Sequence, residues 1–275
     1  MRFETEEKQF KTALARLRQE GYGNLSSSDM DDLINGMVTH IGSPDSELRD
    51  DLIYRSFGFL ILKDRLDAER IFRLLETCSG GENLTFNIDS EDYRHVFRRS
   101  FSMLVVALIL EWDLNKDYLD EKTFRTTASR ILRAYNSEKI IRGYYADEGW
   151  AHTVAHSADA FCLLVAGRWS DESMVREILE SIGSKICRAD YYYIDGEDER
   201  TAEVIRTIEK KDSRFKNLLK DWLDSVSRIS LPETQPGRSI LKGNLRNFLR
   251  SIYFKINDGE LKKHIEELLS SLRFT

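Results

Sequence analysis

Apolar residues recur along almost the whole chain at helical spacing. Near the start, Phe10, Leu14 and Leu17 stand at positions i, i+4 and i+7, which places them on one face of a helix. This periodicity, with the cap and breaker residues around it, predicts about a dozen helices. The clearest of them are expected at residues 26–41, 44–62, 91–112, 121–136, 148–167, 171–187, 197–211, 213–229, 237–256 and 258–272.

Residues 79–90 interrupt the helical pattern. The run 79–83, Ser-Gly-Gly-Glu-Asn, has the composition of a loop. Leu84, Phe86 and Ile88 then alternate with polar residues, which is typical of a strand. A short extended piece is therefore expected at residues 84–88.

The connectors between the predicted helices are short, so neighbouring helices are expected to be antiparallel. Repetition of such pairs predicts an all-α fold, either a HEAT-like α-solenoid or an irregular α-α superhelix. Only three prolines and 15 glycines occur, which agrees with a helical chain. We expect a single helical domain over residues 1–275, in which helices at 213–272 continue the array.

Composition and charge narrow the classes of partner. The formal net charge is −6, and no long basic stripe with interleaved aromatic residues is apparent, so nucleic acid is not expected, although a local groove could be basic. The longest apolar run, Met103 to Leu110, is shorter than the roughly 20 residues that span a bilayer, so no membrane is expected and a buried helix is predicted. Three cysteines without close pairing and an N-terminus without an apolar run predict a cytoplasmic protein.

The predicted helix 148–167 contains the side chains that are best suited to bind a metal ion or another ligand. At about 100° per residue, His152, His156 and Asp159 fall on one narrow stripe of a helix that is otherwise apolar or small. One reading is a site for a divalent metal ion with His152, His156 and Asp159 as ligands. Another is a buried hydrogen-bond network that fixes helix packing. A site for a ligand other than a metal is the third.

A metal ion there would imply hydrolysis, with Glu148 or Glu197 as a candidate general base. The zinc-protease pattern needs Glu directly after the first histidine, and Thr153 stands there instead. Trp150 either stacks on a ligand or anchors the packing of the helix start.

A second segment contains three acidic residues, Glu197, Asp198 and Glu199, followed by Arg200. Acidic residues in the first turn of a helix complement its dipole, which is one explanation for them. The alternative is that Glu197 or Asp198 lines the same cleft as the two histidines, and that Arg200 pairs with an acid or an anionic ligand.

Two arginine-containing runs receive a simpler interpretation. Residues 49–51 (Arg-Asp-Asp) and 98–100 (Arg-Arg-Ser) are predicted to form solvated ion pairs or pairs within one helical repeat.

These segments together resemble a bacterial family catalogued as a domain of unknown function. The resemblance covers roughly residues 30–210. The matching elements are Gly42 to Asp45, Leu48 to Asp50, Arg99 to Ser102, Gly149 to His152 with His156 and Asp159, and Gly196 to Arg200. The resemblance implies a helical, HEAT-like fold and carries over no reaction, substrate or cofactor.

The function predicted from the sequence is therefore a binding or scaffold module with a polar cleft lined by histidine and aspartate. Its ligand residues would be Trp150, His152, His156, Asp159, Glu197, Asp198 and Arg200. The partner would be a protein, a peptide or a small molecule. A metal-dependent hydrolase is the alternative, and a purely structural stripe within a homo-oligomer is a third possibility.

Overall fold

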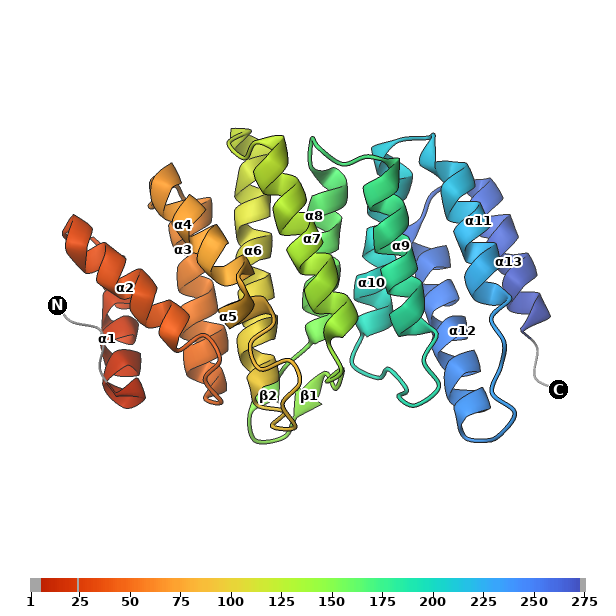
Figure 1. Ribbon diagram of the computed structural model, residues 1–275, viewed down its shortest axis with the longest axis horizontal. Coiled ribbons are helices and arrows are strands. Elements are labelled where there is room, and N and C mark those ends of the chain that lie inside the picture. Colours follow the sequence, from red (N-terminus) through yellow and green to blue (C-terminus); the bar gives the residue numbers. More distant parts are fainter. Residues whose placement is uncertain (1–5, 24, 273–275) are drawn as a thin grey trace. The chain divides into compact units, whose positions relative to one another are not determined.

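The computed structural model describes residues 6–23 and 25–272 (Figure 1). Over these residues the fold is all-α, with one π-helix and one two-stranded hairpin beside the α-helices. The first elements are α1 (Glu7–Gln19), α2 (Ser27–Thr39), η1 (Glu47–Tyr54), α3 (Arg55–Leu62), α4 (Ala68–Ser79), α5 (Gly81–Leu84), α6 (His95–Lys116) and α7 (Glu121–Ser137). They are followed by β1 (Tyr144–Tyr145), β2 (Gly149–Trp150), α8 (Thr153–Ala166), α9 (Glu172–Ile186), α10 (Glu197–Lys211), α11 (Phe215–Ser227), α12 (Gly237–Lys255) and α13 (Gly259–Ser271).

The chain divides into two compact units, Met1–His156 and Ser157–Thr275. The first unit contains the elements from α1 to β2, and the second contains α9 to α13. Helix α8 begins in the first unit and continues into the second. The expectation of one domain over the whole chain stays a prediction.

Helix α6 forms the core of the first unit. Helices α3, α4 and α5 and the π-helix η1 all contact it, and Figure 1 shows α3 and α4 beside it. All eight residues from Met103 to Leu110 are buried, which confirms the prediction that this run is a buried helix. None of the helices within the described residues combines the length and hydrophobicity needed to cross a lipid bilayer.

The second unit is built around the pair α10 and α12, which make the most extensive contact in it. Helix α12 also contacts α9 and α13, and α11 contacts α13. Leu245, Leu249 and Ile252 form the buried face of α12. Contacts between helices thus build this unit, and the antiparallel, HEAT-like arrangement stays a prediction.

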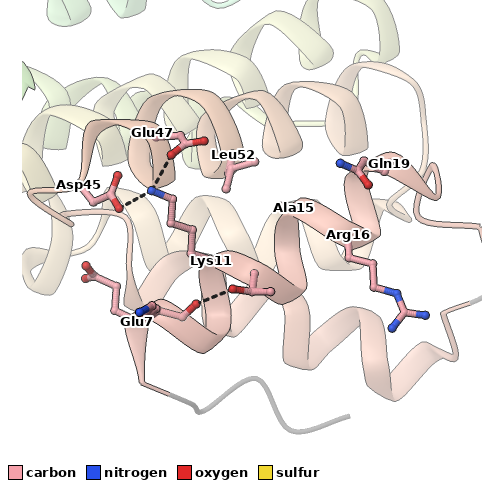
Figure 2. A pocket seen from close by; sticks show the side chains of 10 residues that line it. Glu7, Lys11, Ala15, Arg16, Gln19, Asp45, Glu47 and Leu52 are labelled. Carbon is pink, nitrogen blue, oxygen red and sulfur yellow. Dashed lines mark hydrogen bonds and ion pairs between the residues drawn. The ribbon is translucent and has the colours of Figure 1, made fainter.

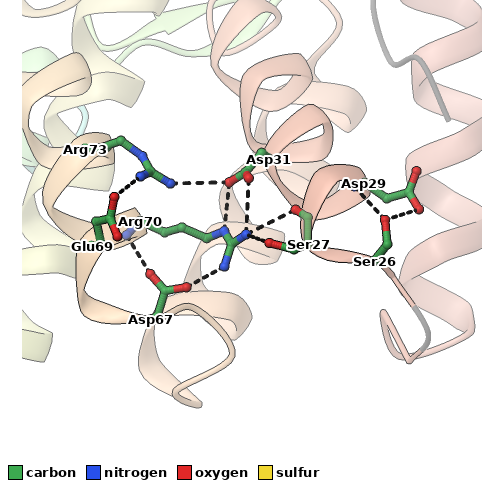
Figure 3. A network of polar contacts seen from close by, with 8 residues as sticks. All are labelled: Ser26, Ser27, Asp29, Asp31, Asp67, Glu69, Arg70 and Arg73. Carbon is green, nitrogen blue, oxygen red and sulfur yellow. Dashed lines mark hydrogen bonds and ion pairs between the residues drawn. The ribbon is translucent and has the colours of Figure 1, made fainter.

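Polar side chains clamp some of these helices together. In the network of Figure 3, the guanidinium of Arg70 on α4 reaches two residues of α2. Its Nε donates to Asp31 Oδ1 at 2.7 Å and its Nη2 donates to the carbonyl of Ser27 at 3.1 Å. Deeper in the fold, Arg99 on α6 donates to both carboxylate oxygens of Glu138, at 2.7 and 2.8 Å. This pair is almost fully buried and ties α6 to the end of α7.

Most helix ends agree with the sequence to within two or three residues, but residues 84–88 were expected to be extended and are not. Residues 81–84 form α5, and turns follow. The side-chain amide of Asn83 donates to the carbonyl of Thr77 at 2.9 Å, which folds this segment back on the end of α4. Arg99 also donates to the carbonyl of Phe86 at 2.9 Å. Contacts with distant residues therefore override a short alternating pattern.

The helix expected at 44–62 is divided. Its first half is the π-helix η1, and α3 follows without a break. The carboxylate of Asp45 accepts from the backbone N–H of Leu48 at 3.1 Å and so caps η1.

The helix expected at 148–167 begins later than predicted. Helix α8 starts at Thr153, and the residues before it form a hairpin in which Tyr144 pairs with Trp150 and Tyr145 with Gly149. His152 therefore precedes the helix instead of lying on it. The cause is Arg49, a buried arginine of η1 that bonds to the carbonyls of Glu148 and Trp150.

Candidate functional site

Arg49, on the π-helix η1, is completely buried. Its Nη1 donates to the carbonyl of Ser43 at 2.7 Å, and its Nη2 donates to the carbonyl of Glu148 at 2.8 Å. A longer bond, at 3.4 Å, joins Nη2 to the carbonyl of Trp150. One guanidinium thus holds the turn before η1 and the hairpin before α8, about a hundred residues apart in sequence.

Aromatic rings and a carboxylate complete the surroundings of this guanidinium. Its carbon lies 4.2 Å from the ring centroid of Phe97 and 4.7 Å from that of Phe101. The Nε is 2.8 Å from Oδ1 of Asp50. Burial lowers the pKa of Arg49 and raises the pKa of Asp50, and the attraction between the two charges opposes both shifts. Ring faces, carbonyls and a counter-ion replace the water that the cation loses.

Burial of Arg49 contradicts a solvated ion pair at this residue, and its pair with the adjacent Asp50 agrees with the alternative of a pair within one helical repeat. Arg49 is buried because it shares a helical face with Leu52 and Ile53, three and four residues later. The position of an arginine on an apolar helix face could be seen in the sequence and indicated that this arginine is buried. A π-helix is also rare and is frequently found at functional sites.

The hairpin is fitted tightly to η1 at Gly149. This glycine has a φ of +80°, a left-handed conformation that side chains disfavour. A Cβ at this position would lie 3.0 Å from Cβ of Ser46 and 3.4 Å from Nη2 of Arg49. Both the backbone conformation and the close approach therefore require glycine here.

His152 is held in the same region by its backbone. Its φ is +46°, and its N–H donates to the carbonyl of Gly143 at 3.2 Å. Its own carbonyl accepts the N–H of His156 at 2.8 Å and so starts α8. The imidazole stacks on the indole of Trp150, with ring centroids 4.2 Å apart and planes only 2° from parallel. Tyr144, opposite Trp150 in the hairpin, also contacts the indole, with ring centroids 4.6 Å apart.

His156 is buried and bonded to α6. Its Nδ1 lies 2.7 Å from Oγ of Ser100, and that hydroxyl also bonds to the carbonyl of Ala151. A carbonyl only accepts and a serine hydroxyl has one hydrogen, so Ser100 donates to Ala151 and His156 Nδ1–H donates to Ser100. The neutral imidazole then carries its lone pair on Nε2. The ring also packs edge-on against Phe101, at 5.4 Å.

Glu148, a candidate general base, is buried in the same unit. Its Oε1 accepts from Nε of Arg94 at 2.7 Å. The carboxylate also raises the pKa of the neighbouring Tyr93 hydroxyl through a hydrogen bond. The structure therefore brings Glu148, Trp150, His152 and His156 together, and it shows Glu148 in an ion pair.

The remaining candidates belong to the second unit. Asp159 accepts two hydrogen bonds from Arg200, one of them from Nε at 3.1 Å. Asp198 accepts from the hydroxyl of Ser251 at 2.7 Å. Glu197 is fully buried, and its Oε2 accepts from the N–H of Asp195 at 2.9 Å. The idea that Glu197 or Asp198 shares a cleft with the histidines stays a prediction.

The proposed metal ligands have other partners in the structure. His156 bonds to Ser100, His152 stacks on Trp150, and Asp159 pairs with Arg200. Within residues 6–23 and 25–272, no group of three or more His, Cys, Asp or Glu side chains is arranged to hold a metal ion. Metal binding by His152, His156 and Asp159 stays a prediction.

A separate groove of about 760 Å³ lies between α1 and the start of η1 (Figure 2). Lys11 reaches from α1 to Asp45 and Glu47, with Nζ at 2.7 Å from the second carboxylate. Asp45, the last residue of the element Gly42 to Asp45, lines this groove, and none of the predicted ligand residues does.

We expect Arg49→Met to release the hairpin, because the carbonyls of residues 43, 148 and 150 lose their donor and Asp50 loses its counter-ion. The free energy of unfolding should fall by roughly 3 kcal/mol, measured by urea denaturation. Amide hydrogen exchange at residues 143–152 should become faster. Arg55→Met is the matched control, because Arg55 makes an exposed ion pair one helical turn away, with Asp51. Unchanged exchange in the hairpin of Arg49→Met would show that Arg49 does not hold it.

Stability should depend on the ionisation of Glu197, because burial raises the pKa of its carboxyl. The folded state then binds this proton more tightly than the unfolded state, so the group stabilises the fold below the unfolded pKa. That contribution is lost as pH rises through the folded pKa. The Glu197→Gln variant does not ionise at this position. We therefore expect its Tm to rise relative to the Tm of the wild type between about pH 4 and about pH 8. The exposed Glu199→Gln is the control, and a flat difference for both variants would contradict the expectation.

Comparison with known proteins gives one match. The family model described as "Protein of unknown function (DUF2785)" matches residues 84–254, more than half of the chain. The match includes the hairpin, both histidines and α12, and Arg49 precedes it. A search of curated proteins found no match, and neither did a search of solved structures. The resemblance to a family of unknown function is confirmed, and the chain belongs to the DUF2785 family.

Proposed function

We propose that this protein is a binding module whose recognition surface is the hairpin of residues 144–152, here called the aromatic hairpin. The observation that carries the proposal is the parallel stack of Trp150 on His152, partly exposed and resting on a buried arginine. The partner is a protein segment, a peptide or a small molecule that presents a flat apolar group.

The backbone and the charge beneath the aromatic hairpin support this role. A left-handed conformation at a residue other than glycine, as at His152, costs about 1–3 kcal/mol. Burial of the Arg49 cation carries a desolvation penalty of several kcal/mol that its partners must offset. A simple connection from α7 to α8 needs neither feature. Strained backbone over buried charge is typical of segments whose side chains are held for recognition.

The side chains that the hairpin presents are suited to contact. Trp150 and Tyr144 are 41% and 40% exposed, and the two rings lie against each other. Arg142 is exposed beside them, and its Nε donates to the carbonyl of Tyr144 at 2.9 Å. Rigid aromatic groups with an arginine nearby dominate the energy of many interfaces. His156, which was predicted to line the cleft, and Glu148, the candidate general base, are both buried.

We also propose that the chain acts in the cytoplasm as a helical-repeat protein. Three free cysteines and helices packed in pairs support this.

Selection from a displayed library of random peptides of about 12 residues tests the aromatic hairpin. We expect peptides that bind the wild type and lose about 30-fold or more in Kd with Trp150→Ala, the effect of removing an interfacial hot spot of about 2 kcal/mol. Tyr118→Ala is the matched control, because Tyr118 is 47% exposed and follows α6 at its other end. Peptides that bind Trp150→Ala as well as they bind the wild type would overturn the proposal.

Metal-dependent hydrolysis is the second candidate, and one observation favours it. Ser100 fixes the His156 tautomer with the lone pair on Nε2, and metal-bound histidines are commonly oriented by such a bond from their other nitrogen. Under this proposal Asp159 exchanges Arg200 for the ion, and Glu148 or Glu197 acts as general base.

Elemental analysis of the purified protein decides this second candidate. Hydrolysis predicts stoichiometric zinc, iron or manganese that disappears when His152→Ala and His156→Ala are combined. Metal-free protein whose Tm does not change on addition of any of these ions would contradict it. The aromatic hairpin proposal does not depend on this result.

A further inference from the structure

Helix α12 has an unusual charge for this chain. Its sequence contains five basic residues, Arg238, Lys242, Arg246, Arg250 and Lys255, and no acidic residue. The chain as a whole contains 47 acidic and 41 basic residues. A solvated helix face in such a chain would be expected to carry both signs.

Four of the five basic residues form one row. Arg238, Lys242, Arg246 and Arg250 are each four residues apart, so successive side chains are displaced by only about 40° around the helix. The next position of the same row is Phe254. We call these five residues the basic row. It extends for roughly 24 Å along α12, since a helix rises about 1.5 Å per residue.

The spacing explains why the basic row is not visible as a run in the sequence. Three other residues separate each basic residue from the next, and short pairs such as Lys210-Lys211 stand out more. Residues four apart form the ridges by which helices pack against one another. A complete ridge of this kind on α12 is therefore cationic and ends in an aromatic ring.

The residues of the basic row are exposed or half-buried. Arg238 and Arg250 are exposed, and Phe254 is 81% exposed. Lys242 and Arg246 are half-buried. The opposite side of α12 packs against α10, and there the hydroxyl of Ser251 donates to Asp198. Packing of the unit therefore does not require these charges.

The cations of α12 differ in their partners. The fifth basic residue, Lys255, is outside it and lies 3.6 Å from Glu203. Arg238 donates to the backbone carbonyls of Pro232 and Glu233, at 2.9 and 3.1 Å. For the part of the chain that the structure describes, no ion pair is formed by Lys242 or Arg250. Lys242 and Arg250 thus present positive charge to an external partner.

We propose that the basic row of α12 is a docking surface for an acidic, amphipathic segment of another protein. Carboxylates of that segment pair with Lys242 and Arg250, and an apolar residue packs on Phe254. Exposed Leu231 lies beside Pro232, whose carbonyl Arg238 holds, so an apolar group is present at each end of the row. Alternating charged and apolar contacts over about 24 Å fit a segment of roughly four helical turns.

The charge distribution favours a short acidic segment over a nucleic acid or an anionic membrane. At physiological salt the Debye length is about 8 Å, so a segment confined to the row experiences its positive charge. A duplex or a lipid surface extends well beyond 24 Å and would meet the rest of a chain whose net charge is −6. One exposed ring, Phe254, is also a small anchor for a bilayer.

The test uses the full chain, a displayed library of random 12-residue peptides, and fluorescence anisotropy with the selected peptides. We expect selected sequences rich in Asp and Glu that contain at least one Leu, Ile or Phe. Their Kd should weaken at least about 10-fold in the double variant Lys242→Glu, Arg250→Glu, because each attraction becomes a repulsion. Phe254→Ser should weaken it too, and binding should weaken as salt is raised.

A matched control has the same change in net charge elsewhere in the second unit. Lys210→Glu with Lys220→Glu reverses two exposed lysines of α10 and α11 and should change Kd less than about 2-fold. Trp150→Ala should leave these peptides bound, which separates this surface from the aromatic hairpin. Milder neutralisation, Lys242→Gln with Arg250→Gln, should weaken binding by less than the reversal does and guards against a folding defect.

Three outcomes would overturn the proposal. One is a selection without acidic bias. Another is an equal loss of binding in the control pair. The third is that a 20-nucleotide single-stranded DNA or phosphatidylserine vesicles bind the row while acidic peptides do not.

Discussion

The geometry of the first unit depends on the burial of one guanidinium. Arg49 has no access to water, so its donors must find carbonyl oxygens inside the protein. Those oxygens belong to Ser43, Glu148 and Trp150, which lie in two separate segments. The need to satisfy one cation therefore fixes the approach of the hairpin to η1, and Gly149 is the residue that permits the contact.

The same arginine is connected to both histidines through its neighbours. Phe101 lies under the guanidinium and against the ring of His156, and the adjacent Ser100 binds His156 and the carbonyl of Ala151. Trp150, whose carbonyl faces Arg49, stacks on His152. Neither ring can be reoriented without disturbing one of these contacts. This rigidity suits recognition by a preformed surface, and it also suits a histidine held in one tautomer for chemistry.

Sequence periodicity predicted most helices because their stability comes from an apolar face, and α10 was placed at its observed bounds. It failed at the start of α8, because nothing local in Trp150, Ala151 and His152 opposes a helix. The helix begins later than predicted because the carbonyls of residues 148 and 150 accept hydrogen bonds from Arg49, about a hundred residues earlier. The candidate residues were partly recovered: Trp150, His152 and His156 meet, whereas Asp159 pairs with Arg200. Which partner a polar group finds is decided by long-range packing, and helical spacing does not contain that information.

Charge has two distinct uses in the two units. Inside the first unit, Arg49 and Arg99 are surrounded by carbonyls, rings and carboxylates. Their charges therefore hold segments of the fold together, and these interactions are little affected by salt. On α12 of the second unit, Arg250 is exposed and Lys242 is half-buried, and an ion pair at such positions would add little stability. A row of four cations on one helical ridge repels itself slightly, since like charges four residues apart disfavour a helix. That cost is offset when carboxylates of a partner approach, so the arrangement is better explained by binding than by folding.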